Sequence, residues 1–304
     1  KVGLYFTGTD DGVVSMSKDA GKTWTNLTTR LVGFPTGAFV SEVVPSRYDS
    51  ATVYITVDNH RLNDYNTYIW VSNDLGATFH SLNANLNGEA VKTLTEDQKN
   101  PDVLYVGTET GLFLTLDRGR SWRRFKANLP SVRVDEVTLH PRDNSMIVAT
   151  HGRALWILDH LEPIQEYAAT QKVAAAGKLF TVPTALQWKS KDDQNEEFWG
   201  HQWFTGENPP TEATISYYLK SAANDLKLRI TDATGRAVRE VTPPLARKQP
   251  GIQTACWDMR VAPIEVPADS TAGRGAGGGG GAGGGGGGGR GGAAGGRGGP
   301  PGVG

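Results

Sequence analysis

The eight residues Ser17-Lys18-Asp19-Ala20-Gly21-Lys22-Thr23-Trp24 decide the fold. They recur as Ser72-Asn73-Asp74-Leu75-Gly76-Ala77-Thr78-Phe79 and as Thr115-Leu116-Asp117-Arg118-Gly119-Arg120-Ser121-Trp122. The shared pattern is [Ser/Thr]-x-Asp-x-Gly-x-[Thr/Ser]-[Trp/Phe], with an apolar, strand-like run before and after each copy. Copies spaced roughly 45–55 residues apart indicate a repeat architecture.

Each part of this motif has a role in a tight turn. The carboxylate accepts backbone N–H groups of the turn, the hydroxyl adds a local hydrogen bond, and glycine permits a positive φ. The aromatic residue starts the next strand and can bury a large apolar area between units. Because the turn forms without a ligand, we expect structural roles for Ser17, Asp19, Gly21, Trp24, Ser72, Asp74, Gly76, Phe79, Thr115, Asp117, Gly119 and Trp122.

The composition excludes several classes of function. The chain has 304 residues, which suggests about two domains. A net charge of −1 gives no strong attraction to nucleic acid or an anionic membrane. The single cysteine excludes an intrachain disulfide and a cysteine-based zinc site, and the scattered histidines predict no metal site and no cofactor. No apolar run is long enough for a membrane span.

Runs rich in Val, Ile, Tyr, Phe and Trp, bounded by Gly, Asn, Asp and Pro, predict strands. They group into units, at residues 3–8, 12–16 and 23–27; 41–44, 52–57, 67–72 and 78–82; 90–95, 103–108, 111–115 and 121–125; and 134–139, 146–150 and 154–158. Four-stranded units at this spacing predict β-propeller blades over residues 1–161. Two blades are complete, the first lacks its first strand, and the last lacks its fourth. The chain starts inside a strand pattern, so we expect it to be a fragment or a processed product.

Longer segments make a family resemblance specific. These are Asp58-Asn59-His60-Arg61-Leu62-Asn63-Asp64, Leu104-Tyr105-Val106-Gly107-Thr108-Glu109-Thr110-Gly111 and Ala149-Thr150-His151-Gly152-Arg153-Ala154-Leu155-Trp156-Ile157-Leu158-Asp159. The Asp motifs resemble the Asp-box (BNR) repeat of sialidases, sortilin-type receptors and xyloglucanases. Residues 1–260 resemble the C-terminal half of large bacterial WD40/YVTN/BNR-like, sortilin-like exported proteins, often labelled glycosyl hydrolases. The resemblance implies an extracellular or periplasmic location.

The order of strands in a blade assigns each turn to a face. Every Asp box joins the third strand to the fourth, so it lies opposite the turns that join the second to the third, at residues 9–11, 58–66, 108–110 and 151–153. Residues 58–66 form a nine-residue polar insertion, longer than a hairpin needs. We therefore predict ligand binding by His60, Arg61, Asp64, Tyr65, Glu109, His151 and Arg153. The alternative is that these residues form solvated loops, pair with backbone groups or dock on a neighbouring domain.

Catalysis stays open at this point. A glycosidase needs two carboxylates roughly 5–10 Å apart on either side of one bond, and Asp58, Asp64 and Glu109 are the candidates on this face. The sequence does not show that any two converge. No Gly-x-Ser-x-Gly motif, phosphate loop or Cys–His nucleophile pattern occurs.

Beyond the blades, residues 162–177 predict a linker with a helical turn. Residues 178–262 resemble the immunoglobulin-like or fibronectin-like sandwich that follows such propellers, with Trp257 as a core residue and the stretch 199–203 packed between domains. Residues 263–304 hold more than half of the chain's 39 glycines and predict a disordered tail. The sandwich is then incomplete.

Together these features predict an all-β chain made of a partial β-propeller with Asp-box blades, a sandwich and a glycine-rich tail. The function we favour is a non-catalytic exported scaffold or binding module for protein, peptide or glycan. The first alternative is a glycoside hydrolase, of the sialidase or xyloglucanase kind, whose site needs further N-terminal blades. The second is a structural component of an extracellular assembly. Further N-terminal propeller segments or a second copy of the chain are additional candidate partners.

Overall fold

The computed structural model describes residues 2–170, 175–187 and 211–262. The stretch 199–203 and the tail 263–304 lie outside the described residues, so the expectations for them stay predictions. Among the described residues, no helix is long and apolar enough to cross a membrane.

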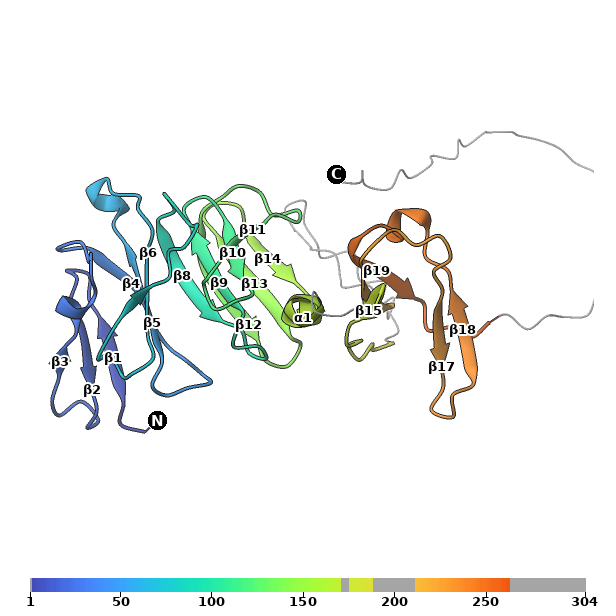
Figure 1. Cartoon of the computed structure of the whole chain (residues 1–304), viewed down its shortest axis with the longest axis horizontal. Helices are drawn as coiled ribbons and strands as arrows, with labels where there is room; N and C mark the ends of the chain where they lie inside the picture. The colour runs from blue at the N-terminus through green and yellow to red at the C-terminus, as the bar shows by residue number, and fades with distance from the viewer. Residues whose placement is uncertain (1, 171–174, 188–210, 263–304) are drawn as a thin grey trace, which may run out of the picture. The chain divides into compact units, whose positions relative to one another are not determined.

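Four antiparallel sheets follow one another along residues 5–158 (Figure 1). The first holds β1 (Tyr5–Gly8), β2 (Val14–Ser17) and β3 (Thr25–Asn26). The second holds β4 (Phe39–Pro45), β5 (Val53–Asp58), β6 (Tyr68–Ser72) and β7 (His80–Ser81). The third holds β8 (Val91–Glu96), β9 (Leu104–Thr108), β10 (Leu112–Thr115) and β11 (Arg123–Phe125). The fourth holds β12 (Val134–His140), β13 (Ser145–Thr150) and β14 (Leu155–Leu158). The predicted all-β fold is confirmed.

The apolar cores lie between successive sheets. One cluster combines Leu27 of the first sheet with Phe79 of the second. Another combines Tyr54 of the second sheet with Trp122 of the third, and a last one combines Tyr105 of the third with Met146 of the fourth. Each sheet therefore buries its faces against its neighbours, as blades do.

The Asp box is a hydrogen-bonded turn. The Ser72 hydroxyl donates to Asp74 Oδ1 at 2.7 Å and accepts the Gly76 N–H at 2.8 Å. Asp74 accepts the backbone N–H of Thr78 at 2.9 Å and its hydroxyl at 2.6 Å. The other two copies repeat these contacts. Such bonds, first from the Thr23 side chain, lower the pKa of Asp19 to about 2. The hydroxyl and carboxylate groups of the motif thus find their partners within the turn.

The Asp box also packs against the preceding blade. Gly76 has φ +75°, and a Cβ there would lie 2.8 Å from Leu27 Cδ1 of the preceding blade. The preceding residue, Leu75, is also left-handed, with φ 57°, which the motif did not predict. Phe79 and Trp122 are buried against neighbouring sheets. Trp24 of the first sheet is 47% exposed, so the expected burial of the box aromatic fails in that blade.

A short helix, α1 (Glu162–Thr170), occupies the start of the predicted linker. Gln165 Nε2 donates to both carboxylate oxygens of Asp97, at 3.1 and 3.0 Å, and to Asn144 Oδ1 at 2.9 Å. Asn144 Nδ2 in turn donates to Glu162 Oε1 at 2.7 Å. These buried contacts fix α1 to the turns that follow β8 and β12.

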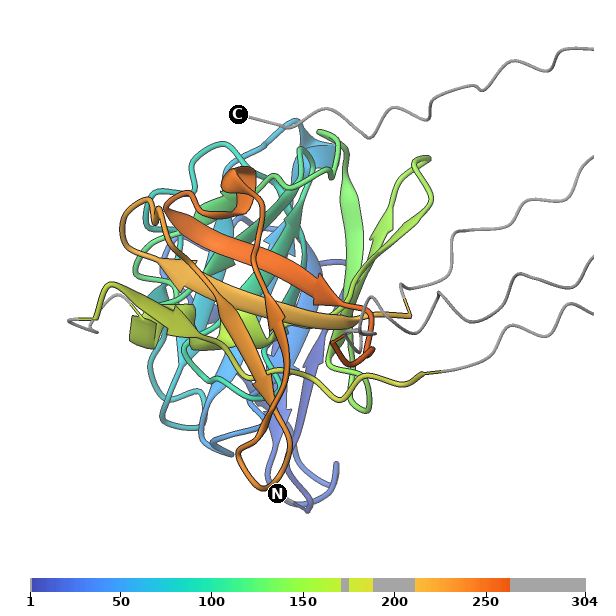
Figure 2. The same ribbon diagram turned by 90° about the vertical axis from the view of Figure 1, so that its right-hand side faces the viewer.

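The remaining strands form two small sheets (Figure 2). One holds β15 (Gly177–Leu179), β16 (Ala213–Leu219) and β19 (Gly251–Trp257), and the other holds β17 (Leu228–Thr231) and β18 (Ala237–Val241). The described residues also include the short 3₁₀ segments η1 (Thr28–Arg30), η2 (His60–Leu62) and η4 (Leu245–Arg247). The immunoglobulin-like assignment of residues 178–262 stays a prediction.

Candidate ligand-binding face

A β-bulge recurs at the start of the first strand in three blades. In β4 the register skips between Val40 and Glu42, and in β8 it skips between Val91 and Thr93. β12 skips in the same way between Val134 and Glu136. A bulge adds one unpaired residue and changes the direction of its side chain. The added residues are Ser41, Lys92 and Asp135.

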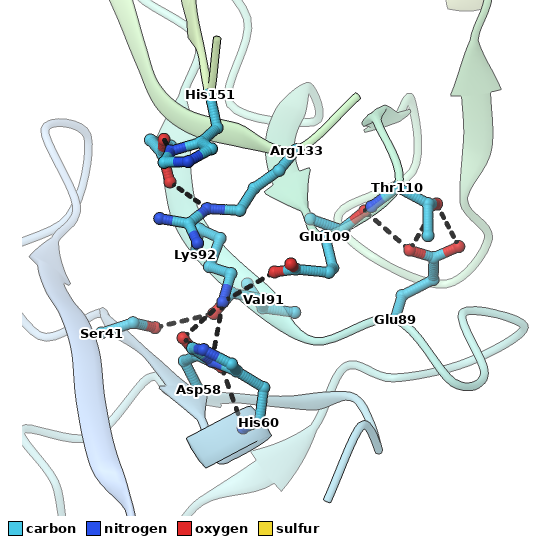
Figure 3. A network of polar contacts seen from close by, with 12 residues as sticks. Ser41, Asp58, His60, Glu89, Val91, Lys92, Glu109, Thr110, Arg133 and His151 are labelled. Carbon is cyan, nitrogen blue, oxygen red and sulfur yellow. Dashed lines mark hydrogen bonds and ion pairs between the residues drawn. The ribbon is translucent and has the colours of Figure 1, made fainter. Parts of the chain in front are cut away.

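The ends of the second strands lie beside these bulges. Asp58 ends β5, and Glu109 and His151 directly follow β9 and β13. The backbone N–H of Glu109 donates to Ala90 O at 3.0 Å, and that of His151 donates to Arg133 O at 2.9 Å. The same backbone geometry therefore brings the second-strand ends next to the residues that open β8 and β12 (Figure 3).

Lys92 lies at the centre of the resulting cluster and contacts Asp58, His60 and Glu109. Its Nζ lies 2.6 Å from Asp58 Oδ2 and 2.9 Å from Glu109 Oε2, the latter an ion pair outside hydrogen-bond geometry. It also lies 2.9 Å from His60 Nδ1, which is itself 2.7 Å from Asp58 Oδ1. The side chains of Lys92 and Asp58 are only 7% exposed. Burial alone would raise the pKa of Asp58, but hydrogen bonds from Lys92 and His60 lower it below its ordinary value.

The alternation of charge continues into the fourth sheet. Arg133 Nε lies 2.6 Å from Asp135 Oδ1, and His151 Nδ1 lies 3.6 Å from Asp135 Oδ2. The hydrogen bond that Arg133 donates to Asp135 raises the pKa of Arg133, and the charges of Asp135, Glu109 and Asp58 raise it further. We call the set Asp58, His60, Lys92, Glu109, Arg133, Asp135 and His151 the charge ladder; Figure 3 labels its members other than Asp135.

The other predicted binding residues behave differently. Asp64 accepts hydrogen bonds from Asn59 Nδ2 and the Tyr68 hydroxyl, both at 2.8 Å, so its carboxylate shapes the loop 58–66. The Arg61 guanidinium lies over the Phe39 ring, 5.4 Å from its centroid. Tyr65 and Arg153 are exposed. Within the described residues, none of these four side chains forms a hydrogen bond or ion pair with the charge ladder.

Sequence reasoning missed three members of the charge ladder, Lys92, Arg133 and Asp135. A usable signal existed, because Ala90-Val91-Lys92 and Arg133-Val134-Asp135 open equivalent strands after equivalent links. When the starts of these equivalent strands are aligned, as the Asp boxes are, Lys92, Arg133 and Asp135 fall on the same face. In the described residues, no three His, Cys, Asp or Glu side chains gather to hold a metal ion.

The ion pairs of Lys92 affect whether the carboxylates on this face can transfer a proton. Asp58 and Glu109 both pair with the single ammonium of Lys92, so they lie close together. The general acid of a glycosidase, however, needs a raised pKa, and the pKa of Asp58 is lowered. The carboxylates of the cluster are paired within it, both with Lys92.

The stacked sheets and their box turns define an Asp-box β-propeller segment. The Sortilin-Vps10 family, described as sortilin, neurotensin receptor 3, matches residues 67–225, and the chain belongs to that family. No curated protein matches the sequence.

Several solved structures are similar to this chain at low identity. The GH74 xyloglucanase of Xanthomonas campestris is 15% identical over 51% of this chain and 27% of its own, with a TM-score of 0.39. The chain thus covers only 27% of that enzyme's length. PorZ of Porphyromonas gingivalis, a surface component of the type-IX secretion system, is 15% identical over 84% of this chain and 32% of its own, with a TM-score of 0.38. YCF48 bound to D1 peptide is 11% identical over 82% of this chain and 68% of its own, with a TM-score of 0.38. Similarity at this level carries no argument about function.

Proposed function

We propose that this chain is part of a non-catalytic, exported β-propeller binding module. Its binding face consists of the charge ladder and the loop 58–66, and its ligand is a protein, peptide or glycan. The observation that supports this most directly is that Lys92 pairs with both carboxylates that a hydrolase would use on this face.

The surroundings of the charge ladder suit recognition. The ladder holds its own charges in place, so little side-chain entropy is lost when a ligand binds above it. Exposed groups lie in the same turns: Tyr65, in the loop 58–66, is 48% exposed, the side chain of the ladder residue His151 is 70% exposed, and Arg153, two residues later, is exposed. Tyrosine and arginine are the residue types that dominate binding energy at interfaces. The opposite face carries the Asp boxes, whose hydroxyl and carboxylate groups bond within the turn.

A glycoside hydrolase is the second candidate. The observation in its favour is the closeness of Asp58 and Glu109 at one ammonium. That role requires a further acid group, from another segment or a partner, to supply a proton.

The test is a binding screen of the folded chain against peptide and glycan arrays, with affinities measured for the strongest ligand. Tyr65→Ala and Arg153→Ala should each weaken binding about tenfold, which corresponds to about 1.4 kcal/mol. Arg120→Ala is the matched control, because Arg120 is equally exposed but lies in an Asp-box turn. It should bind like the wild type.

Three outcomes contradict the proposal. One is that no array member binds, and another is that both face variants keep full affinity, as a purely structural role would give. The third is hydrolysis of an arrayed glycan that is lost in Glu109→Gln, which would establish the enzyme instead.

A further inference from the structure

The link between β7 and β8 holds three asparagines whose side chains are used differently. Asn83 Oδ1 accepts the Ile69 N–H at 3.0 Å, and Asn83 Nδ2 donates to Thr67 O at 2.6 Å. Asn85 Nδ2 donates to Trp122 O at 2.9 Å, and Asn85 Oδ1 accepts the Trp122 N–H at 2.7 Å. The amides of Asn83 and Asn85 are therefore held by the backbone of the second and third blades.

Asn87, the third of these residues, is not held. It is exposed, and within the described residues neither its side-chain amide nor the backbone N–H of Gly88 forms a hydrogen bond. Gly88 has φ +69°, and a Cβ there would meet no atom within 4 Å. The chain is fixed again at Glu89, whose N–H donates to the Thr67 hydroxyl at 3.2 Å. Asn87 and Gly88 thus form a short exposed stretch between fixed residues.

An asparagine followed by glycine can react without an enzyme. The backbone nitrogen of the glycine loses its proton to water or hydroxide and attacks the side-chain carbonyl carbon of the asparagine, and the new C–N bond closes a succinimide ring. The bond from that carbon to the amide nitrogen breaks, and the nitrogen leaves as ammonia after taking a proton from water. Water then opens the ring at either carbonyl, which gives aspartate or isoaspartate. The net change is the uptake of one water and the release of one ammonia, with no oxidation or reduction.

We propose that Asn87 is a modification site, at which the folded chain deamidates through a succinimide formed with Gly88. This is the one Asn-Gly pair in the sequence. Glycine has no Cβ to shield the attacking nitrogen, and among the described residues nothing bonds to that nitrogen or to the amide it attacks. Asn83 and Asn85 lack this freedom because both ends of their amides are bonded. Water is the only co-reactant, so the reaction does not depend on the proposed binding function.

Glu89 connects this site to the turn that carries Glu109 of the charge ladder (Figure 3). The Thr110 hydroxyl donates to the two carboxylate oxygens of Glu89 at 2.7 and 2.8 Å, and the Thr108 hydroxyl donates to Glu89 Oε2 at 2.7 Å. Either product adds a negative charge two residues before Glu89, and isoaspartate also adds a methylene to the main chain. We therefore expect isoaspartate at position 87 to weaken the bonds between Glu89 and this turn.

The first experiment incubates the folded chain at neutral and mildly alkaline pH and follows the link by peptide mass spectrometry. The product gains the mass that replacing NH₂ with OH gives, and a protein isoaspartyl methyltransferase labels its isoaspartate form. Asn87 should react faster as pH rises, because attack requires loss of the Gly88 amide proton. Asn83 and Asn85 should stay intact in the same sample.

Two controls separate the chemistry of the pair from its place in the fold. Gly88→Ala puts a Cβ beside the attacking nitrogen and should slow the reaction about tenfold. The chain unfolded in guanidinium chloride gives the rate without structure, and the folded rate should lie within about tenfold of it. A folded rate far below that range overturns the proposal, because the fold would then protect Asn87. An unchanged rate in Gly88→Ala overturns it as well.

The second experiment measures amide hydrogen exchange at Glu109, whose N–H donates to Ala90 O at 3.0 Å. Exchange in the isoaspartate form, isolated from the aged chain, should be about tenfold faster than in the fresh chain. Asn87→Asp carries the same charge on an ordinary main chain and should exchange like the fresh chain. Equal exchange in aged and fresh chains contradicts the effect on the turn. An equal increase in Asn87→Asp contradicts the role of the added methylene.

Discussion

Replacing Glu42 with glutamine should remove a pH dependence from the stability of the blades. The pKa of this carboxyl is about 7 in the folded protein and 4.5 as its ordinary value. Because its pKa is raised, the Glu42 carboxyl binds its proton more tightly in the folded state than in the unfolded state. The contribution of this proton to the stability of the fold is complete below about pH 4.5 and is lost as pH rises through 7. At about 1.36 kcal/mol per unit, the carboxyl destabilises the folded chain at pH 8, relative to pH 4, by about 3 kcal/mol.

Urea unfolding between pH 4 and 8.5 tests this value, with fluorescence of the buried Trp70 as one signal. The glutamine carbonyl can still accept the Leu94 N–H, so the contact at 2.6 Å is preserved while the titration is removed. The unfolding free energy of the variant, minus that of the wild type, should grow by about 3 kcal/mol as pH rises across this range. Glu240→Gln, at an exposed carboxylate, should follow the wild-type profile. A difference that stays constant with pH would refute the reasoning, because Glu42 would then have an ordinary pKa in the folded state.

Two further predictions concern the blade contacts. Gly76→Ala should lower the unfolding free energy by about 2–4 kcal/mol, since it combines a positive φ with a Cβ 2.8 Å from Leu27. Gly88→Ala has φ +69° but open space, and should cost about 1 kcal/mol in the same urea assay; equal losses would contradict the packing role. Lys92→Met should cost about 3–5 kcal/mol and raise the pKa of Asp58, because it leaves buried charge unpaired. Adding Asp58→Asn should recover part of that loss in a double-mutant cycle, and additive effects would contradict direct pairing.

The fold could be predicted from sequence because its signals are local. The box turn needs only residues within eight positions, from Ser72 to Phe79, and its hydrogen bonds form inside that segment. Strand runs bounded by turn residues are equally local. The exposure of Trp24, in contrast, depends on whether a preceding blade covers it, and no local pattern contains that information.

The candidate site could be predicted only in part. The topology placed His60, Glu109 and His151 on one face, and the structure brings them into the charge ladder. Lys92 was missed because it pairs with a residue of another blade, Asp58. Its direction also depends on a β-bulge, which the alternation of apolar residues in the sequence does not reveal. Asp64 was assigned to binding because it lies in the long polar loop on this face, and in the structure its carboxylate accepts hydrogen bonds from Asn59 and Tyr68.

The repeats within this chain separate the residues that build the blades from those that can recognise a ligand. Three Asp boxes keep the same hydrogen bonds, since each box must satisfy the same turn. The three bulges keep the backbone but carry a neutral, a basic and an acidic residue, Ser41, Lys92 and Asp135. In the charge ladder, Lys92 pairs with Asp58 of the preceding blade and with Glu109 of its own blade, and Asp135 pairs with Arg133 of its own blade. One residue further along, the equivalent positions are not balanced in this way, because Glu42 and Glu136 are both acidic and the charge of Glu136 contributes to the raised pKa of Glu42. A repeat scaffold can leave such an imbalance in place only at a cost in stability, and the pH dependence of the Glu42→Gln variant measures that cost.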